Sequence, residues 1–387
     1  NGLSRIGVVG GGQLARMLVD ASRHRNVEVI VQTPSLADPA AQIAADVIEA
    51  DPVDADATQA LLRRCSSITF ENEWVSIEAL TALERKGARF RPSLASLKPL
   101  VNKLHQRQLL DRLSIPSPDW VELISIDPGA PSLPKGWSFP VMAKAVTGGY
   151  DGRGTRVLKT IDCLAELLRS VDPDDWILEA WVDYESELAL VVSRDQSGRV
   201  RALPLAQTHQ SNQVCDWVFA PADVEQLVEA TAYNIAASLL TTLDYVGVMA
   251  IEMFYGSKGL LVNEIAPRTH NSGHFSIEAC HSSQFDQQLC IAAGLDIPDP
   301  VLKVPGALMV NLLGLPADQA TSLDQRLSAL RAEPSLNLHW YDKQGESPGR
   351  KLGHVTVVLD GEDASSRWRQ AMDALQRVRS IWPLPLN

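Results

Sequence analysis

The feature that most restricts how this chain can fold is a pair of apolar segments, residues 247–254 and 260–265, that read as two strands. A short, glycine-containing turn sequence joins them, and Gly259 stands where a left-handed residue closes a three-residue hairpin loop. That loop length predicts an antiparallel pair in which Glu252 lies opposite Glu264. Because side chains alternate between the faces of a strand, both glutamates are expected on one face.

Two carboxylates opposed across a sheet repel each other, so the arrangement favours a bridging cation or one carboxyl with a raised pKa. Oxygen ligands of this kind suit Mg²⁺, which takes its remaining ligands from water and phosphates. The same register pairs Phe254 with Val262 and Gly256 with Leu260, and it turns Asn263 to the opposite face. Two solvated glutamates are the alternative, which the apolar neighbours on that face disfavour.

A second motif, residues 148–154, holds four glycines in seven positions between two strand-like segments. Such density excludes a helix or strand interior and indicates a flexible hairpin whose bare backbone N–H groups can surround a triphosphate. Lys144, at the end of the preceding strand, can add a positive charge. No Gly-Lys-Ser/Thr sequence follows, so this is not a Walker loop, and a hairpin without a ligand is the alternative.

Two further segments are dense in polar groups. Residues 267–274 carry an arginine, two histidines, an asparagine and a serine soon after Glu264, which suits anion binding and proton handling. Residues 339–354 form a basic island in an acidic chain, with Lys343 and Arg350 among its cations. A structural histidine is the alternative for the first segment, and a solvated loop is the alternative for the second.

The first hundred residues alternate strand and helix signals, which predicts a parallel sheet with crossover helices, an α/β arrangement. Gly10, Gly12 and Ala15 follow the first strand in the spacing of a dinucleotide-binding turn. The second strand runs to Gln32 and Thr33 without the acidic residue that holds a ribose in such sites. This disfavours a nicotinamide-dependent oxidoreductase and leaves a plain strand-to-helix turn or a phosphate site for another ligand.

Composition narrows the partners. The chain of 387 residues carries 35 basic and 47 acidic residues, a formal net charge of −12, which disfavours nucleic acid and anionic membranes as partners. Its five cysteines are far apart and form no CxxC pair, as in a cytoplasmic protein with reduced thiols. No run of about 18 apolar residues could span a membrane, and no signal-peptide pattern precedes the first strand.

The order of the motifs along the chain resembles one enzyme family. The chain shows GGGQLARML at residues 10–18, TFENEWV at 69–75, GGYDGRG at 148–154, VNEIAPRTHNSGH at 262–274, SQFDQQL at 283–289 and YDKQGESPGRKLGH at 341–354. This set closely resembles 5-(carboxyamino)imidazole ribonucleotide synthases, the ATP-grasp carboxylases of bacterial purine synthesis, over nearly the whole chain. Other ATP-grasp ligases share the lid and the glutamate pair but lack HNSGH and GRKLGH together.

The resemblance implies an ATP-grasp fold, α/β with α+β character in the ATP-binding part, preceded by a Rossmann-like parallel-sheet domain. Its divisions would be a first domain over residues 1–99, a central lid domain over 100–182 and a C-terminal ATP-grasp domain over 183–387, with a small subdomain from about 305. The reaction implied is the ATP- and bicarbonate-dependent carboxylation of 5-aminoimidazole ribonucleotide, through carboxyphosphate, with release of ADP and phosphate.

By the same resemblance, ATP lies between two small antiparallel sheets, and its Mg²⁺ or Mn²⁺ is held by Glu252 and Glu264. The residues that match the family's nucleotide contacts are Lys103, Lys144, Gly149, Tyr150, Asp151, Gly152, Arg153, Gly154, Thr155, Glu179, Ala180, Trp181, Val182, Glu187, His209, Asn263 and Glu264.

The resemblance places the carboxylation chemistry in a pocket of mostly charged side chains. Its members are Tyr150, Asp151, Arg153, Arg268, His270, Asn271, Lys343 and Arg350. Fixed cations there would stabilise the reacting anions and the charge that develops. Contacts to the ribonucleotide are implied for Gln13, Glu73, Arg268, Lys343 and Arg350, which makes the first glycine turn a substrate site and not a cofactor site.

Two positions depart from the family pattern. The family has Asp-Arg where this chain has Asn102-Lys103, and a lysine keeps the charge but loses the bidentate fork of arginine. Thr155 stands where the family has glutamine. The partners implied are small molecules, namely ATP, bicarbonate and 5-aminoimidazole ribonucleotide, together with a second copy of the chain in a homodimer.

Overall fold

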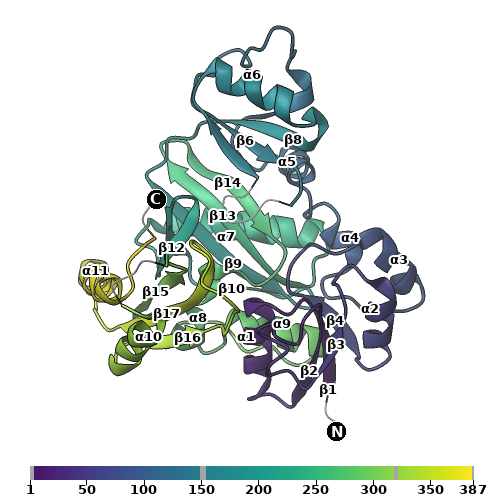
Figure 1. Cartoon of the computed structure of the whole chain (residues 1–387), viewed down its shortest axis with the longest axis vertical. Helices are drawn as coiled ribbons and strands as arrows, with labels where there is room; N and C mark the ends of the chain where they lie inside the picture. The colour runs from purple at the N-terminus through teal and green to yellow at the C-terminus, as the bar shows by residue number, and fades with distance from the viewer. Residues whose placement is uncertain (1–3, 149–153, 318–320, 386–387) are drawn as a thin grey trace.

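The computed structural model describes residues 4–148, 154–317 and 321–385. Within these ranges the strands form three sheets, and the molecule has three lobes (Figure 1). One sheet lies in the upper lobe, one lies in the lower right lobe, and the third passes between them towards the lower left (Figure 1). None of the helices in the described ranges is long and apolar enough to cross a membrane.

The first sheet is parallel, as the alternation of strands and helices predicts, and its strand order is β3-β2-β1-β4. Because the strands are parallel, their carboxyl ends share one edge, where Gly10, Thr33 and Glu71 lie. The elements are β1 (Ser4–Val9), α1 (Gln13–Ser22), β2 (Val27–Thr33), β3 (Asp46–Glu49), α2 (Ala55–Leu62), β4 (Ser67–Phe70), α3 (Ile77–Arg85) and α4 (Leu94–Leu97).

The upper lobe is a small antiparallel sheet of order β5-β8-β6-β7, which helix α5 (Lys103–Arg112) precedes in the chain. Helix α6 (Ile161–Ser170) packs its leucines on this sheet in one buried cluster. The other elements are β5 (Trp120–Glu122), η1 (Leu123–Ser125), β6 (Val141–Ala145), β7 (Thr155–Leu158), η2 (Pro173–Asp175) and β8 (Trp176–Ala180).

The third sheet is antiparallel, with the path β14-β13-β9-β11-β12-β15-β17-β16 and β10 paired to β9. It continues past residue 305, because β15 pairs with β12. The strands are β9 (Ser186–Arg194), β10 (Val200–Ala202), β11 (Ala206–Ser211), β12 (Val214–Ala220), β13 (Gly247–Gly256), β14 (Gly259–Ala266), β15 (Gly306–Leu313), β16 (Asn337–Trp340) and β17 (Lys351–Leu359). The helical segments are α7 (Gln226–Thr242), η3 (Asn271–Gly273), α8 (Ser276–Ala279), α9 (Gln284–Ala293), α10 (Leu323–Ala332) and α11 (Ala364–Ile381).

Helix α9 joins the first sheet to the third. Its apolar side enters the core of the first sheet through Phe285 and Leu289. On its polar side, the Gln288 amide donates to Thr69 Oγ1 at 2.7 Å and accepts from the backbone N–H of Val248 at 2.7 Å. Buried amides need such partners, so this helix fixes the parallel sheet and strand β13 relative to each other.

The β13–β14 hairpin confirms the opposition of Glu252 and Glu264 but corrects the register around it. The turn is one residue shorter than predicted, because Gly256 already pairs with Gly259. Phe254 therefore lies opposite Leu261 and not Val262, and Leu260 faces Tyr255 instead of Gly256. A bulge between Glu252 and Met253 takes up the extra residue on β14 and restores the glutamate pair. Gly259 has the predicted left-handed backbone, with φ of 76°.

Candidate active site

The two glutamates of the hairpin have very different acidities. Burial, followed by repulsion from Glu264, raises the pKa of Glu252 to about 7. Burial also acts to raise the pKa of Glu264, but the ammonium group of Lys103 outweighs it and brings that pKa to about 2. Lys103 Nζ lies 2.5 Å from Glu264 Oε1. Glu264 therefore has a cationic partner in Lys103, whereas the charge of Glu252 is opposed by burial and by Glu264.

Helix α5 positions Lys103. The Asn102 side chain accepts the backbone N–H of His105 and caps the helix, so Lys103 is its first residue. The backbone N–H of Lys103 also donates to the carbonyl of Val146, just beyond β6, at 2.8 Å. Lys103 thus reaches the glutamate pair from the junction between the upper lobe and the third sheet.

A buried ion network lies beside the pair. Glu179 at the end of β8 receives Arg107 Nη2 at 2.6 Å and Lys144 Nζ at 2.7 Å. Lys144 Nζ also donates to Asn263 Oδ1 at 3.0 Å. Burial opposes ionisation of Glu179, but the cations Arg107 and Lys144 prevail and hold its pKa below the ordinary value. The bulge in β14 thus explains how Asn263, expected to face away, reaches a cation of the site.

The glycine-rich lid begins and ends beside this network. Strands β6 and β7 pair so that Lys144 faces Thr155, and the backbone N–H of Ala145 donates to the carbonyl of Gly154 at 2.7 Å. Gly154 has φ of 74°, a conformation that favours glycine. The predicted contacts Gly149, Tyr150, Asp151, Gly152 and Arg153 lie outside the described residues.

A second group of predicted nucleotide contacts lies next to the hairpin. Strand β9 places Glu187 opposite Phe254, and Tyr184 donates its hydroxyl to Glu187 Oε1 at 2.6 Å. Burial raises the pKa of Glu187. His209 on β11 is exposed and stacks on the ring of Trp217 at 5.2 Å. Ala180, Trp181 and Val182 lead out of β8, and Trp181 is exposed.

The polar segment after β14 connects the glutamate pair to the first sheet. Arg268 Nε lies 2.7 Å from Glu73 Oε2, which follows β4. His270 Nε2 lies 3.7 Å from Glu252 Oε1, and its Nδ1 is 2.9 Å from Ser272 Oγ. The Gln284 side chain fixes the segment, because it accepts the backbone N–H of His270 and donates to the His270 carbonyl.

Asn271 is brought near these residues but is buried. Its Nδ2 donates to Asn311 Oδ1 at 2.9 Å, and its Oδ1 accepts from Asn311 Nδ2 at 2.6 Å. Both amide atoms of Asn271 are therefore bonded within the protein. This arrangement anchors the segment to β15. Asn271 therefore has fewer polar groups available for a ligand than Arg268 and His270.

The first glycine turn closes around a side chain that the sequence reasoning missed. Glu71 Oε2 accepts the backbone N–H of Gly12 at 2.8 Å, at the start of α1, which has no other side-chain cap. A carboxylate at this helix terminus takes the place that a phosphate would occupy in a dinucleotide site. Burial raises the pKa of Glu71, opposed by hydrogen bonds from the turn and by the charges of Lys343 and Arg268.

Gln32 stands near the end of β2, where a dinucleotide-binding protein would have an acidic residue. Gln32 is fully buried, its amide donates to the Asp51 and Asp54 carbonyls, and Thr58 donates to its Oε1. This side chain is thus bonded within the first sheet's lobe. Gln13, the first residue of α1, follows the turn directly.

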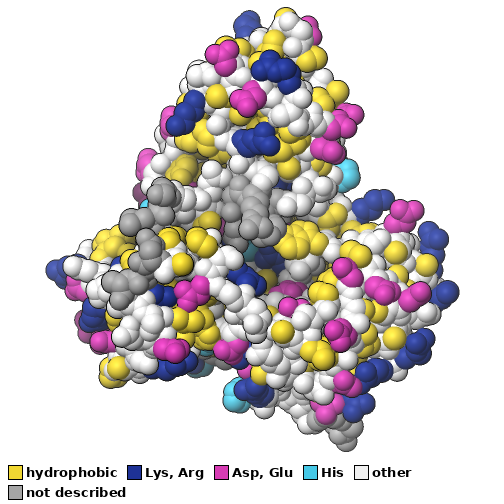
Figure 2. Space-filling model, in the orientation of Figure 1, with side chains coloured by type: hydrophobic (Ala, Val, Ile, Leu, Met, Phe, Trp, Pro, Cys, Tyr) yellow, Lys and Arg dark blue, Asp and Glu magenta, His cyan; other side chains and the backbone are white. Residues whose placement is uncertain are grey.

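The basic island lies near the same turn. Lys343 Nζ donates to the carbonyl of Lys351 at 2.7 Å, and Arg350 Nη1 donates to the carbonyl of Gln344 at 2.5 Å. Lys343 and Arg268 both act on the carboxyl of Glu71, so the two cations approach the turn from different parts of the chain. The space-filling view shows Lys and Arg side chains near the centre of the face where the lobes meet (Figure 2).

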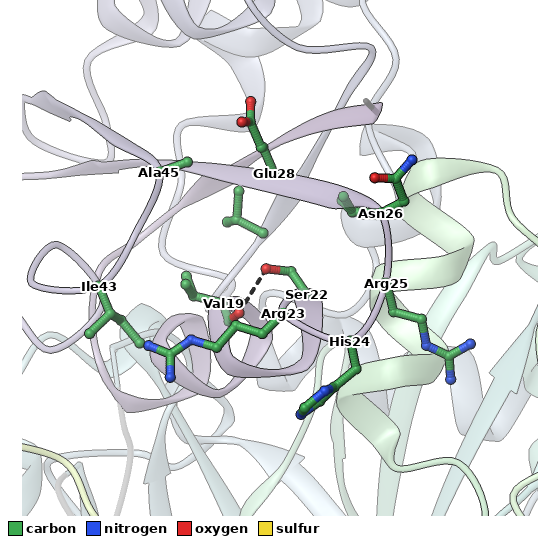
Figure 3. Close-up of a pocket in the computed structure, with 11 residues that line it drawn as sticks. Val19, Ser22, Arg23, His24, Arg25, Asn26, Glu28, Ile43 and Ala45 are labelled. Atoms are coloured by element: carbon green, nitrogen blue, oxygen red, sulfur yellow. Dashed lines mark hydrogen bonds between the residues drawn. The ribbon is translucent and has the colours of Figure 1, made fainter. Parts of the chain in front are cut away.

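A separate hollow of about 560 Å³ lies at the other end of α1, among Val19, residues 22–29, Ile43 and Ala45 (Figure 3). It opens at the amino edge of the parallel sheet, opposite the glycine turn. Its cations have acidic partners nearby: Arg25 lies 3.4 Å from Asp286 on α9, and Arg23 lies 3.4 Å from Asp20. Since ligands of such sheets bind at the carboxyl edge, this hollow is not the site.

Three family models match successive parts of the chain. Residues 3–99 match the ribonucleotide synthetase preATP-grasp domain, residues 108–285 match the ATP-grasp domain, and residues 307–367 match the phosphoribosylaminoimidazole carboxylase C-terminal domain. The N5-carboxyaminoimidazole ribonucleotide synthase of Synechococcus elongatus is 46% identical over 385 residues, which cover 99% of this chain and 96% of that protein. The Synechocystis enzyme of the same name is 39% identical over 98% of each chain.

Solved structures are similar over the same length. The N5-carboxyaminoimidazole ribonucleotide synthetase of Thermus thermophilus has a TM-score of 0.85 at 28% identity and covers 99% of this chain and 100% of that one. The Aspergillus clavatus enzyme, in complex with ADP and 5-aminoimidazole ribonucleotide, has a TM-score of 0.83 at 29% identity and covers 97% of this chain and 99% of that one.

Proposed function

The chain belongs to the N5-carboxyaminoimidazole ribonucleotide synthase family, and from that premise we propose how its residues share the work. It is an ATP-grasp ligase that converts 5-aminoimidazole ribonucleotide to N5-carboxyaminoimidazole ribonucleotide in purine biosynthesis. The observation that carries the assignment of roles is one short segment: His270 lies beside Glu252, while Arg268 pairs with Glu73 of the first sheet. This segment joins the nucleotide side to the ribonucleotide side.

On the nucleotide side, Lys103 and Lys144 meet the ATP phosphates under the glycine-rich lid. Their present partners, Glu264, Glu179 and Asn263, hold both ammonium groups at the mouth of the β13–β14 hairpin. Residues 179–182 line the adenine, and Glu187 with His209 contacts the nucleoside. The buried network around Glu179 supports this role because it fixes Lys144 before any nucleotide binds.

Mg²⁺ or Mn²⁺ belongs at Glu252 and Glu264. The described residues hold no group of three or more His, Cys, Asp and Glu side chains that could enclose an ion. Two carboxylates from one hairpin fit Mg²⁺, which keeps waters and takes further ligands from phosphates. The raised pKa of Glu252 supports the same place, since a cation would relieve its repulsion from Glu264. The bound ion would neutralise charge on the transferring phosphate.

The carboxylation proceeds in two steps. A bicarbonate oxygen attacks the γ-phosphorus of ATP, the bond between that phosphorus and ADP breaks, and carboxyphosphate forms. Carboxyphosphate then breaks into phosphate and CO₂, and the amine nitrogen of 5-aminoimidazole ribonucleotide bonds to that carbon and loses a proton. Arg268 and His270 stabilise the anions between the two substrates together with Arg153 of the lid, and Tyr150 and Asp151 complete the pocket. Fixed cations are effective there because they need no reorganisation during the reaction.

The ribonucleotide lies over the first glycine turn. Gln13, Glu73 and Arg268 contact its ribose side, while Lys343 and Arg350 hold its phosphate. The influence of Lys343 and Arg268 on Glu71 supports this placement, since both charges approach the turn. Asn271 supports the pocket through its pairing with Asn311. The domains end at about residues 99 and 182, and the active form is a cytoplasmic homodimer.

The test is nucleotide turnover by the purified protein with each substrate omitted in turn. We expect ADP release to depend on both bicarbonate and 5-aminoimidazole ribonucleotide. ADP release that ignores both compounds would contradict the assignment, and a dependence on formate in place of bicarbonate would point to a different ATP-grasp ligase.

A further inference from the structure

The basic island is tied to the first sheet by a residue with an unusual backbone. Asp342 has φ of 55°, in the left-handed region that aspartate visits more readily than most residues. Its carboxylate lies 2.7 Å from Arg16 Nη2 on α1, and its carbonyl accepts the Gln42 amide at 3.2 Å. Arg16 is itself held by the carbonyl of Pro39 at 3.1 Å. Asp342 is thus fixed by two side chains of the first sheet's lobe.

This contact relates two predicted substrate residues to each other. Gln13 and Arg16 are three positions apart on α1 and therefore lie on the same side of the helix. Lys343 follows Asp342 directly. The Arg16–Asp342 pair consequently sets where the basic island stands relative to the helix end that carries Gln13.

Tyr341 provides a second anchor on the other side of Asp342. Its ring is 1% exposed and belongs to the apolar cluster of the first sheet and α9, although the residue comes from the C-terminal part of the chain. Its hydroxyl lies 2.7 Å from His354 Nδ1 on β17. Lys343 Nζ stands 5.6 Å from the centre of the same ring. The backbone before Lys343 is therefore held from both sides.

We propose that Asp342 is a positioning residue, which uses its pair with Arg16 to hold Lys343 where the phosphate of the ribonucleotide binds. The inference rests on the proposed function, because that function gives Lys343 its ligand. Asp342 itself touches no substrate. Its side chain is 47% exposed, and an ion pair so exposed to water adds little to stability. Its value lies in orientation, and loss of orientation appears in substrate affinity before it appears in the folded state.

The test compares two substitutions of Asp342 and one of its neighbour Tyr341 by steady-state kinetics of the purified enzyme. D342G keeps the left-handed backbone but removes the carboxylate, so KM for 5-aminoimidazole ribonucleotide should rise by about tenfold, while KM for ATP stays unchanged. D342N keeps both the backbone preference and an acceptor for Arg16, so it should restore most of the affinity. Y341F, which removes the hydroxyl and keeps the ring, should raise the same KM.

A double variant separates positioning from a general effect of charge. If Asp342 acts through Arg16, R16Q should raise KM for the ribonucleotide, and R16Q with D342G should be no worse than D342G alone. Additive effects of the two substitutions would overturn the proposal. So would an unchanged KM for the ribonucleotide in D342G.

The chain offers a matched control in another Arg–Asp pair. Asp244 also has a left-handed backbone, with φ of 44°, and lies 2.8 Å from Arg194 Nη1. D244G removes the same groups from a pair whose carboxylate is 88% exposed and whose arginine is not a predicted site residue, so KM for the ribonucleotide should not change. The result is separable from the proposed function: if wild-type ADP release needs both substrates and D342G behaves as wild type, only the positioning role fails.

Discussion

Glu252 and Glu264 face each other across β13 and β14 because a bulge in the hairpin compensates for a turn that is one residue shorter than predicted. Without the bulge, the short turn would shift β14 by one residue and turn Glu264 to the other face of the sheet. The bulge also leaves Asn263 bonded to Lys144. The bulge thus places the carboxylate pair next to the Asn263 amide that bonds to Lys144.

Removing the charge of Glu264 should abolish turnover without unfolding the protein. In Glu264→Gln the partner of Lys103 and the proposed metal ligand are both lost, so we expect kcat to fall by about 100-fold or more. The midpoint of urea unfolding should change little, because loss of the pair with Lys103 is offset by removal of the repulsion that Glu264 exerts on Glu252. Glu122→Gln, on the exposed surface of β5, is the control and should behave as wild type. Full activity of Glu264→Gln with normal Mg²⁺ dependence would refute the metal assignment.

The buried network should be a major source of stability for the upper lobe. Glu179→Gln leaves Arg107 and Lys144 as buried cations without a carboxylate, so the free energy of unfolding should drop by about 3–5 kcal/mol. Urea denaturation followed by circular dichroism measures this. Glu28→Gln breaks the exposed pair with Arg5 and should cost less than about 1 kcal/mol. Equal losses in the two variants would contradict the network's role.

A methyl group at the first glycine turn should weaken ribonucleotide binding. A Cβ at Gly12 would lie 2.4 Å from Glu71 Oε1, so Gly12→Ala must push the carboxylate away from the start of α1. We expect KM for 5-aminoimidazole ribonucleotide to rise about tenfold or more, with KM for ATP unchanged. An increase confined to ATP would mean that the turn belongs to the nucleotide site after all.

Two buried histidines should make stability depend on pH. Burial lowers the pKa values of His274 and His354 well below their ordinary value, so the folded protein keeps them neutral while the unfolded chain takes up protons below about pH 6.5. Stability is therefore expected to fall as pH drops from 6.5 towards 5, by up to about 1.4 kcal/mol per pH unit for each histidine.

Urea titrations of His354→Asn across this pH range check the expectation. The asparagine can keep a partner for the Tyr341 hydroxyl. The slope of unfolding free energy against pH should become shallower, because one proton fewer is taken up on unfolding. An unchanged slope in His354→Asn would mean that this histidine is charged in the folded protein.

The features that could be predicted from the sequence are those that depend on a single short segment. The hairpin pattern predicted the Glu252–Glu264 opposition, the two strand-like segments that flank the glycines do pair as β6 and β7, and the strand–helix alternation predicted the parallel sheet. The absence of an acidic residue at Gln32 remains an argument from sequence against a nicotinamide site; the structure shows only that the Gln32 amide bonds to the Asp51 and Asp54 carbonyls. Each of these depends on periodicity or turn chemistry, which are local properties.

The remaining site contacts join residues that are distant in sequence. Glu71 meets Gly12 only because β4 pairs with β1. Arg107 meets Glu179, and Asn311 meets Asn271, across elements whose packing leaves no periodic signal in either segment. The bulge could not be predicted because two effects decide it together: the length of the turn, and which side chains of the two strands must be buried. The chemistry of these residue types could be read from the sequence, but their partners could not.

The most direct test of the account follows the carbon of bicarbonate. Purified protein is incubated with ¹³C-bicarbonate, Mg²⁺, ATP and 5-aminoimidazole ribonucleotide, and the products are observed by ¹³C NMR under mildly alkaline conditions that preserve a carbamate. The account predicts a new carbamate resonance that requires ATP and the ribonucleotide and grows in step with ADP. Consumption of ATP with all of the label remaining in bicarbonate and CO₂ would contradict it.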